Sequence, residues 1–240
     1  MSDDSFEAAW FFAADVDGWL SEDQARQLFA AAATVDPGRA VVEIGSHHGR
    51  SMIVLARGVR AGVRVVAVDP FDDSRWGGGA ESQEVFRANL RRAGVGDRVE
   101  VVRCTSADAA RGWDGEPLGL VYLDGAHDRQ SVLADIDGWS GRVAEGGLLV
   151  LHDAFSSVGV TQAMLRRFFG RRRFTYQRSV GSLVLFRRDQ ASPAAAVVGG
   201  LRLAARLPYF GRNIAVKFAL RRRWPRICRA LGHVGDGDPY

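Results

Sequence analysis

Cysteine is scarce in this chain of 240 residues, which has only Cys104 and Cys228. Two cysteines so far apart exclude a disulfide framework and a cysteine-rich zinc site, and they favour a reducing compartment. The segment Met1 to Glu7 holds acids where a secretory signal would have basic residues and an apolar run. Hydrophobic residues at 47% and charged residues at 25% exclude a disordered chain. We therefore expect a folded cytoplasmic protein.

Acidic residues are absent between Asp189 and Asp236. Residues 190–240 carry nine Lys or Arg and two Asp, a net charge of +7, whereas the rest of the chain carries −3. The composition changes near Ser192, which predicts three parts. These are an N-terminal helical cap (1–37), a central domain (38–190) and a basic amphipathic helical tail (191–240).

The tail has apolar residues at helical spacing, with arginines over much of the remaining surface. Pro225 should kink or divide this helix. Its uncharged stretches are shorter than the ~20 residues that span a bilayer. Three interpretations stay open: packing on the domain or on a second copy in a homo-oligomer, contact of residues 200–231 with the inner membrane surface, and, least favoured, nucleic acid. The apolar positions are Val216, Leu220, Trp224, Ile227 and Leu231.

Short apolar runs alternate with helix-like stretches before the tail, which is typical of an α/β protein with a mostly parallel sheet and helices on both faces. Two further strands flanking Val180-Gly181 predict a closing hairpin. The expected strands are 40–44, 64–68, 99–103, 118–123, 148–151, 174–178 and 182–187. The expected helices are 21–35, 51–61, 83–93, 130–143 and 158–169, the first with a capping box from Ser21 to Gln24.

A glycine-bracketed turn follows the first strand and leads into a helix, in the order Glu43-Ile44-Gly45-Ser46-His47-His48-Gly49-Arg50-Ser51. Such a turn brings backbone N–H groups close to a nucleotide-like ligand. The Gly45-x-x-x-Gly49 spacing differs from the GxGxxG of dinucleotide folds, and the acid Glu43 disfavours a pyrophosphate. Both features favour S-adenosylmethionine over NAD. Adjacent histidines in a turn seldom aim at one ion, so we expect His47 and His48 to shape the loop or contact the cofactor.

Two later strand ends supply further ligand contacts. Asp69 ends the second strand, where its carboxylate can accept ribose hydroxyls. A polar loop at Ser106-Ala107 follows the third strand and can meet the adenine edge. The segment 71–80 is either a lid over the substrate or a plain connector.

Acids and histidines follow the fourth and fifth strands, at Asp124 with His127 and at His152 with Asp153. In a parallel sheet both strand ends face the same crevice. Two carboxylates there can hold Mg²⁺, and a histidine can remove a hydroxyl proton. The alternative is that Asp124 and Asp128 cap the helix that follows and that His152 is a loop histidine with a satisfied hydrogen bond.

These residues resemble those of class I S-adenosylmethionine-dependent methyltransferases, and in particular the small-molecule O-methyltransferases that include catechol and macrolide-sugar enzymes. The resemblance covers roughly residues 38–188. It implies a Rossmann-like seven-stranded sheet with the last strand antiparallel. It also implies that Glu43 and Gly45 lie at the methionine end of the cofactor, Asp69 at the ribose, and Ser106 and Ala107 at the adenine. Ser46, Gly49, Ser51 and Asp124 complete the expected cofactor site.

The catechol-type enzymes carry a lysine base three residues after the first acid, where this chain has His127, and an amide metal ligand where this chain has Ala154. We therefore expect His127 and Asp124 to be catalytic, with Asp124 and Asp153 as the candidate magnesium ligands. The expected reaction is methyl transfer to a hydroxyl of a sugar, phenol or glycolipid. The alternative is a non-catalytic cofactor-binding module that the tail tethers to a membrane or partner.

Overall fold

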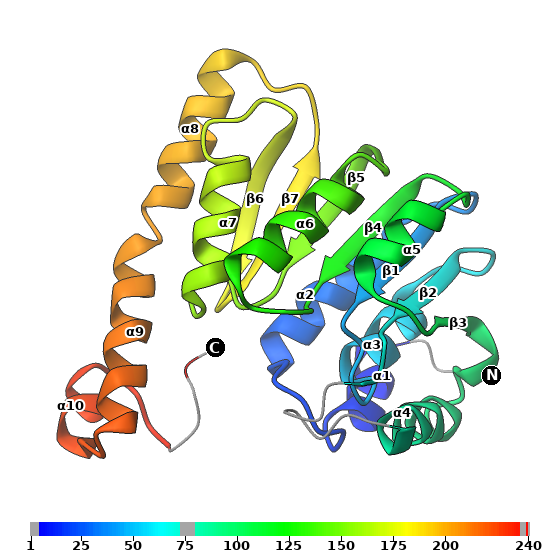
Figure 1. The fold of residues 1–240 in the computed structure, drawn as a ribbon, viewed down its shortest axis with the longest axis horizontal. Coiled ribbons are helices and arrows are strands. Elements are labelled where there is room, and N and C mark those ends of the chain that lie inside the picture. The colour runs from blue at the N-terminus through cyan, green and yellow to red at the C-terminus, as the bar shows by residue number, and fades with distance from the viewer. Residues whose placement is uncertain (1–4, 73–79, 236–238, 240) are drawn as a thin grey trace.

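A computed structural model describes residues 5–72, 80–235 and 239. Most of the segment considered as a lid, 71–80, lies outside these residues. The centre of the structure is a seven-stranded sheet with helices on both faces (Figure 1). The strands are β1 (Ala40–Ile44), β2 (Arg64–Val68), β3 (Val99–Val102), β4 (Leu118–Leu123), β5 (Val143–Leu151), β6 (Phe174–Val180) and β7 (Leu183–Arg188).

The strand order is β3-β2-β1-β4-β5-β7-β6, and β7 runs antiparallel to both of its neighbours. The expected Rossmann-like sheet with an antiparallel last strand is therefore confirmed. Strand β5 begins earlier than predicted, because Val143 pairs with Leu118 before the irregular stretch at Gly146. The order reverses between β1 and β4, so the carboxyl ends of these two strands form the crevice where α/β proteins bind ligands.

Helices precede, connect and follow the strands. They are α1 (Phe6–Ala13), α2 (Glu22–Ala32), α3 (Arg50–Gly58), α4 (Ala80–Arg92), the 3-10 turn η2 (Gly96–Arg98), α5 (Ser106–Gly112), α6 (Arg129–Ser140), α7 (Val158–Phe168), α8 (Pro193–Ala204), α9 (Leu207–Arg221) and α10 (Pro225–Ala230). The capping box of α2 is confirmed, since Gln24 N donates to Ser21 Oγ and Ser21 N donates to Gln24 Oε1. Helix α1 lies within the expected N-terminal helical cap (1–37), but its own bounds were not predicted.

The apolar core lies in two layers, one on each face of the sheet. Leu28, Leu55 and Phe86 pack with Tyr122 on one face. On the other face Trp139 and Met164, among others, pack with alternate residues of the same strands. The strands are apolar on both sides because both sides are covered, as in parallel sheets generally.

The tail folds into α8, α9 and α10, which form an arm beside β6 and α7 (Figure 1). Pro225 is the first residue of α10, so the predicted division is confirmed. The predicted apolar face is only partly correct: Val216 is buried, but Trp224 and Ile227 are 44% and 43% exposed. In the part of the chain that is described, no helix is both long and apolar enough to cross a membrane. The boundaries at 37/38 and 190/191 stay predictions.

Candidate active site

The glycine loop joins β1 to α3 and passes directly over the end of β4. Gly45 and Gly49 have φ of 85° and 90°, which L side chains rarely adopt. A Cβ on Gly45 would lie 2.4 Å from the carbonyl oxygen of Asp124. Gly49 is the N-cap of α3 and has no side chain to cap the free N–H groups of the first turn. The loop thus needs glycine at both positions, and it presents a helix N-terminus to the crevice.

Glu43 is a fully buried carboxyl group at the carboxyl end of β1. Burial raises its pKa to about 8, although the nearby hydroxyls of Ser46 and Ser51 oppose this shift. Neither carboxyl oxygen has a hydrogen-bond partner among the described residues, and the hydroxyl of Ser46 has none either. An unpaired buried carboxyl is costly, which points to a cationic ligand group as its missing partner.

Asp69 supports the glycine loop directly. Its Oδ2 accepts hydrogen bonds from the backbone N–H groups of Ser46 (2.8 Å) and His47 (2.9 Å), and its Oδ1 accepts one from Phe71 N–H (2.7 Å). The sequence pattern predicted a ribose ligand and did not predict this structural role. A substitution of Asp69 therefore disturbs the loop as well as any ligand contact.

Ser106 and Ala107 open helix α5 rather than forming the expected polar loop. Thr105 is the N-cap, and its hydroxyl accepts a hydrogen bond from Asp108 N–H. Ser106 Oγ accepts a hydrogen bond from Trp139 Nε1 at 3.0 Å. The expectation of a loop was wrong because Thr105-x-x-Asp108 is a helix-start pattern. The adenine contact that we expected from Ser106 and Ala107 stays a prediction.

Two carboxylates and two histidines meet at the ends of β4 and β5. His127 Nε2 lies 3.0 Å from Asp153 Oδ2, and His152 Nδ1 lies 3.1 Å from Asp124 Oδ1. His152 Nδ1 is also 3.6 Å from Asp153 Oδ2. The predicted constellation is therefore assembled, but His127 pairs with Asp153 and not with Asp124. Of the two acids considered as helix caps, Asp128 is the N-cap of α6, as predicted, and Asp124 does not cap it.

The carboxylates and imidazoles of this cluster shift one another's pKa values. Despite desolvation, the carboxylates of Asp124 and Asp153 raise the pKa of buried His152 to about 10. The hydrogen bond to Asp153 raises the pKa of His127, whose side chain is 44% exposed. The two histidines in turn hold the pKa of Asp153 well below its usual range. At neutral pH His152 is thus a buried imidazolium between two carboxylates, while His127 faces solvent.

Two residues of this cluster were not predicted from the sequence. Tyr122 donates its hydroxyl proton to Asp124 Oδ2 at 2.9 Å. Gln24, predicted only as a helix cap, is buried, and its Oε1 lies 3.4 Å from His152 Nε2. Gln24 Nε2 also donates to Ser182 Oγ in the closing hairpin at 3.0 Å. A buried glutamine so early in the chain carries no local signal of this distant contact.

The loop after β5 has a strained backbone. Asp153 and Phe155 have φ of 54° and 64°, a region where residues other than glycine cost on the order of 1–3 kcal/mol each. Ser156 Oγ donates to Asp153 Oδ1 at 2.6 Å, and Thr161 Oγ1 accepts from Phe155 N–H at 3.0 Å. Fully buried Asn213 of α9 donates its Nδ2 hydrogen to the Phe155 carbonyl oxygen at 3.0 Å. The tail thus helps to hold the loop that carries Asp153.

The raised pKa values of His152 and Glu43 predict that the stability of the protein depends on pH. Both His152, with a pKa raised from 6.5 to about 10, and Glu43, raised to about 8, bind protons more tightly in the folded state. Their contributions to the free energy of unfolding are therefore present at low pH and are lost as the pH rises. Most of the Glu43 contribution is lost by about pH 8, so His152 accounts for most of the remaining change, and we expect the free energy of unfolding to fall by roughly 1 kcal/mol per pH unit between pH 8 and 10.

Urea denaturation at pH 8, 9 and 10 measures this slope. The variant His152→Gln should be less stable at pH 8 and should show a much flatter profile above it. An equal slope in the variant and the wild type would contradict the assignment of this proton to His152.

Comparison with known proteins identifies similar sequences and similar structures. Residues 42–154 match the family model described as "Methyltransferase domain". A catechol O-methyltransferase of Mycobacterium tuberculosis is 36% identical over 134 residues, which is 56% of this chain and 56% of that protein. The match thus spans little more than half the length of this curated relative.

Solved structures share the fold over most of the chain. The cofactor-bound protein Rv0187 from MTB is 26% identical, with a TM-score of 0.60 over 79% of this chain and 92% of its own. The O-methyltransferase TomG of Streptomyces achromogenes, in complex with SAM, has a TM-score of 0.57 at 20% identity over 79% of this chain and 91% of its own. An O-methyltransferase of Bacillus cereus in complex with SAH has the same TM-score at 22% identity over 78% of this chain and 92% of its own.

Proposed function

We propose that this chain, whose residues 42–154 form a methyltransferase domain of the class I fold, transfers a methyl group from S-adenosylmethionine to a hydroxyl oxygen of a small molecule. The family resemblance read from the sequence is confirmed. The alternative of a non-catalytic binding module is not favoured, because an exposed histidine and a buried carboxylate are paired at the crevice beside the glycine loop.

The residues of the glycine loop fit the cofactor. The unpaired, buried carboxyl of Glu43, whose pKa burial raises to about 8, is suited to a positively charged amino group. Gly45 and Gly49 have positive φ and let the loop pack closely on the Asp124 backbone and the Phe86 ring, and Ser46 and Ser51 are buried beside Glu43. Asp69 holds the loop and keeps lone pairs for ribose hydroxyls.

S-adenosylmethionine, when bound, supplies an activated methyl group whose carbon–sulfur bond breaks as the acceptor oxygen forms its bond to carbon, with the electron pair going to sulfur. The protein's contribution is alignment of the acceptor and removal of its proton. His127 donates its Nε2 hydrogen to Asp153, which leaves Nδ1 as the atom that accepts the hydroxyl proton. Asp153 then stabilises the imidazolium. His152 and Tyr122 fix the carboxylate of Asp124 beside this dyad.

Asp124 and Asp153 are also candidate ligands of Mg²⁺, which binds to one or two carboxylates and keeps several waters, but the ion would have to replace their pairs with His127 and His152. The buried side chain of Ala154 offers no further ligand atom. An ion held by these two carboxylates would lower the pKa of an acceptor hydroxyl.

Calorimetric titration with S-adenosylhomocysteine tests the cofactor site. We expect wild-type protein to bind it and the isosteric variant Glu43→Gln to bind about 10- to 100-fold more weakly, because a charge-assisted hydrogen bond contributes about 1.5–3 kcal/mol. Asp69→Asn, which keeps one acceptor oxygen for the loop, should bind more tightly than Asp69→Ala. Absence of binding by the wild type would contradict the proposed function.

The tail supports a further part of this proposal, contact with an anionic membrane surface. A continuous run of exposed residues links the end of α9 to α10, and it combines arginines with apolar side chains. Phe218 stacks edge-on against Trp224, and the Arg222 guanidinium lies 5.1 Å from the Phe218 ring centroid. Basic clusters mixed with aromatic residues are typical of peripheral membrane contacts. The run is Arg221, Arg222, Arg223, Trp224, Pro225, Arg226 and Ile227.

Sedimentation with lipid vesicles tests the membrane contact. We expect binding to vesicles with phosphatidylglycerol but not to pure phosphatidylcholine, weakened by salt. Replacing Arg222, Arg223 and Arg226 by Gln should weaken binding about 100-fold, at about 1 kcal/mol per arginine. A matched triple variant of the exposed Arg87, Arg91 and Arg92 on α4 should bind like the wild type. Equal binding to both vesicle types would contradict the contact. Whether the protein forms a homo-oligomer stays a prediction to be tested.

A further inference from the structure

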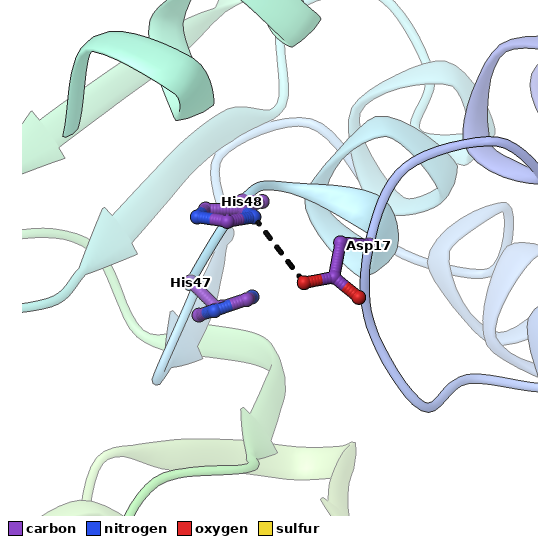
Figure 2. A group of neighbouring side chains, drawn as sticks. All are labelled: Asp17, His47 and His48. Carbon is purple, nitrogen blue, oxygen red and sulfur yellow. Dashed lines mark ion pairs between the residues drawn. The ribbon is translucent and has the colours of Figure 1, made fainter. Parts of the chain in front are cut away.

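The connection between α1 and α2 lies against the glycine loop and places a carboxylate beside the two adjacent histidines (Figure 2). Asp17 Oδ2 is 3.8 Å from His48 Nδ1. The rings of His47 and His48 are stacked, with centroids 3.8 Å apart and planes 23° apart. One potential ligand atom of each residue lies within 4.8 Å of the other two.

The backbone conformation explains why two adjacent histidines face the same way. His47 has φ of 45°, which turns the chain so that both rings lie on one side of the loop. Asp69 accepts a hydrogen bond from His47 N–H, and the His48 carbonyl oxygen accepts one from Asn89 Nδ2 at 3.0 Å. The expectation from sequence, that adjacent histidines do not aim at one ion, took no account of this turn or of Asp17, which is 30 residues away along the chain.

We propose that Asp17, His47 and His48 bind one divalent transition-metal ion of the zinc type, at a site separate from Asp124 and Asp153. Two imidazoles and a carboxylate are a donor set that suits zinc and late first-row metals better than magnesium. Ligand atoms around tetrahedral zinc lie about 3.4 Å apart, given bond lengths of about 2.1 Å. Asp17 Oδ2 and His48 Nδ1 are 3.8 Å apart, and all three ligand atoms lie within 4.8 Å of one another. Binding therefore requires rotation of the 74% exposed Asp17 side chain and rotation of the stacked imidazole rings, so that both ring nitrogens point at one ion.

The ion would join two segments that protein contacts already hold together. Arg50 Nη1 donates to the carbonyl oxygens of Val16 (3.2 Å) and Gly18 (2.8 Å), and the Trp19 ring lies 5.7 Å from that of His47. A metal bond from Asp17 to the histidines would add a third link between this connection and the glycine loop. Occupancy would therefore fasten the α1–α2 connection over the loop, with the remaining coordination position open to solvent or to a bound ligand.

Zinc titration of the metal-stripped full chain tests the proposal, with calorimetry for affinity and the visible absorption of Co²⁺ for ligand geometry. We expect one ion per chain. Removal of one of three ligands should weaken binding at least 10-fold in Asp17→Asn and more in His47→Ala and His48→Ala. As controls, Asp153→Asn in the other cluster and His233→Ala near α10 should keep wild-type zinc affinity.

Asp17 is exposed, so its variant should fold even if the histidine variants do not. Zinc affinity that is unchanged in Asp17→Asn, or no binding to wild-type protein at micromolar concentrations, would overturn the proposal. The readout is metal binding in the absence of cofactor, so it does not depend on whether the protein transfers methyl groups.

Discussion

Replacing His127 by alanine is expected to lower kcat by about 10²- to 10⁴-fold, the usual contribution of a general base, with the affinity for S-adenosylhomocysteine unchanged. His127 is half exposed at the crevice and pairs with Asp153, so its loss removes the proton acceptor without opening the core. The measurement is steady-state methylation of a hydroxyl acceptor by wild-type and variant protein. Activity of the variant within threefold of the wild type would exclude His127 as the base.

The pH profile separates the role of a base from a purely structural role. Because Asp153 raises the pKa of His127, the neutral form that accepts a proton appears only above the ordinary value of 6.5. We therefore expect kcat/KM to rise with pH through an apparent pKa above 6.5. In Asp153→Asn this limb should move to lower pH and kcat should fall, because the imidazolium loses its partner.

Substitution of Gly45 by alanine is expected to have the largest effect on cofactor binding. The new Cβ would lie 2.4 Å from the Asp124 carbonyl oxygen and 2.8 Å from Gly125 Cα, so the ends of β1 and β4 must move apart. Both sides of this contact are backbone and cannot rotate away. We expect loss of measurable S-adenosylhomocysteine binding and a destabilisation of at least about 3 kcal/mol, in the range of severe single substitutions.

Gly38 provides a matched control, because it has nearly the same φ of 84°, but a Cβ at this position would have no atom of the described residues within 4 Å. Gly38→Ala carries only the backbone cost, about 1 kcal/mol, and should keep cofactor affinity. Thermal unfolding and calorimetric titration of both variants distinguish steric contact from conformational strain. Equal effects of the two substitutions would show that the close contact between the loop after β1 and the end of β4 is not the reason for glycine at position 45.

The strands and most helices could be predicted because the local signals are strong. The sheet between 40 and 123 follows from short apolar runs, and β1, β2 and β4 agree with the predicted residues. Prediction failed where a local pattern was incomplete or misread, as for α5, whose start was taken for a loop. The predicted start of β5 was less exact, because residues before Leu148 belong to this strand but pair with β4 in an irregular register.

Only the site residues that follow directly after a strand could be predicted from the sequence. Asp124, His127, His152 and Asp153 come together because parallel strands end at one edge, which the alternation of elements predicts. Their pairing could not be predicted, since it depends on side-chain rotamers at two loops. Gln24 and Asn213 come from helices at opposite ends of the chain, and no local pattern connects them to His152 or Phe155.

The hydrogen bond from Asn213 to the Phe155 carbonyl oxygen also affects the order in which parts of the site form during synthesis. The chain emerges from the ribosome N-terminus first, so the glycine loop, the sheet and the carboxylates of Asp124 and Asp153 are made before α9. Until α9 docks, the strained loop at Asp153 and Phe155 lacks the hydrogen bond that Asn213 donates to the Phe155 carbonyl oxygen. The nascent chain therefore has its glycine loop before the loop after β5 is fully supported, and the proposed catalytic arrangement at Asp153 is complete only after α9, which leads into the basic surface, has docked.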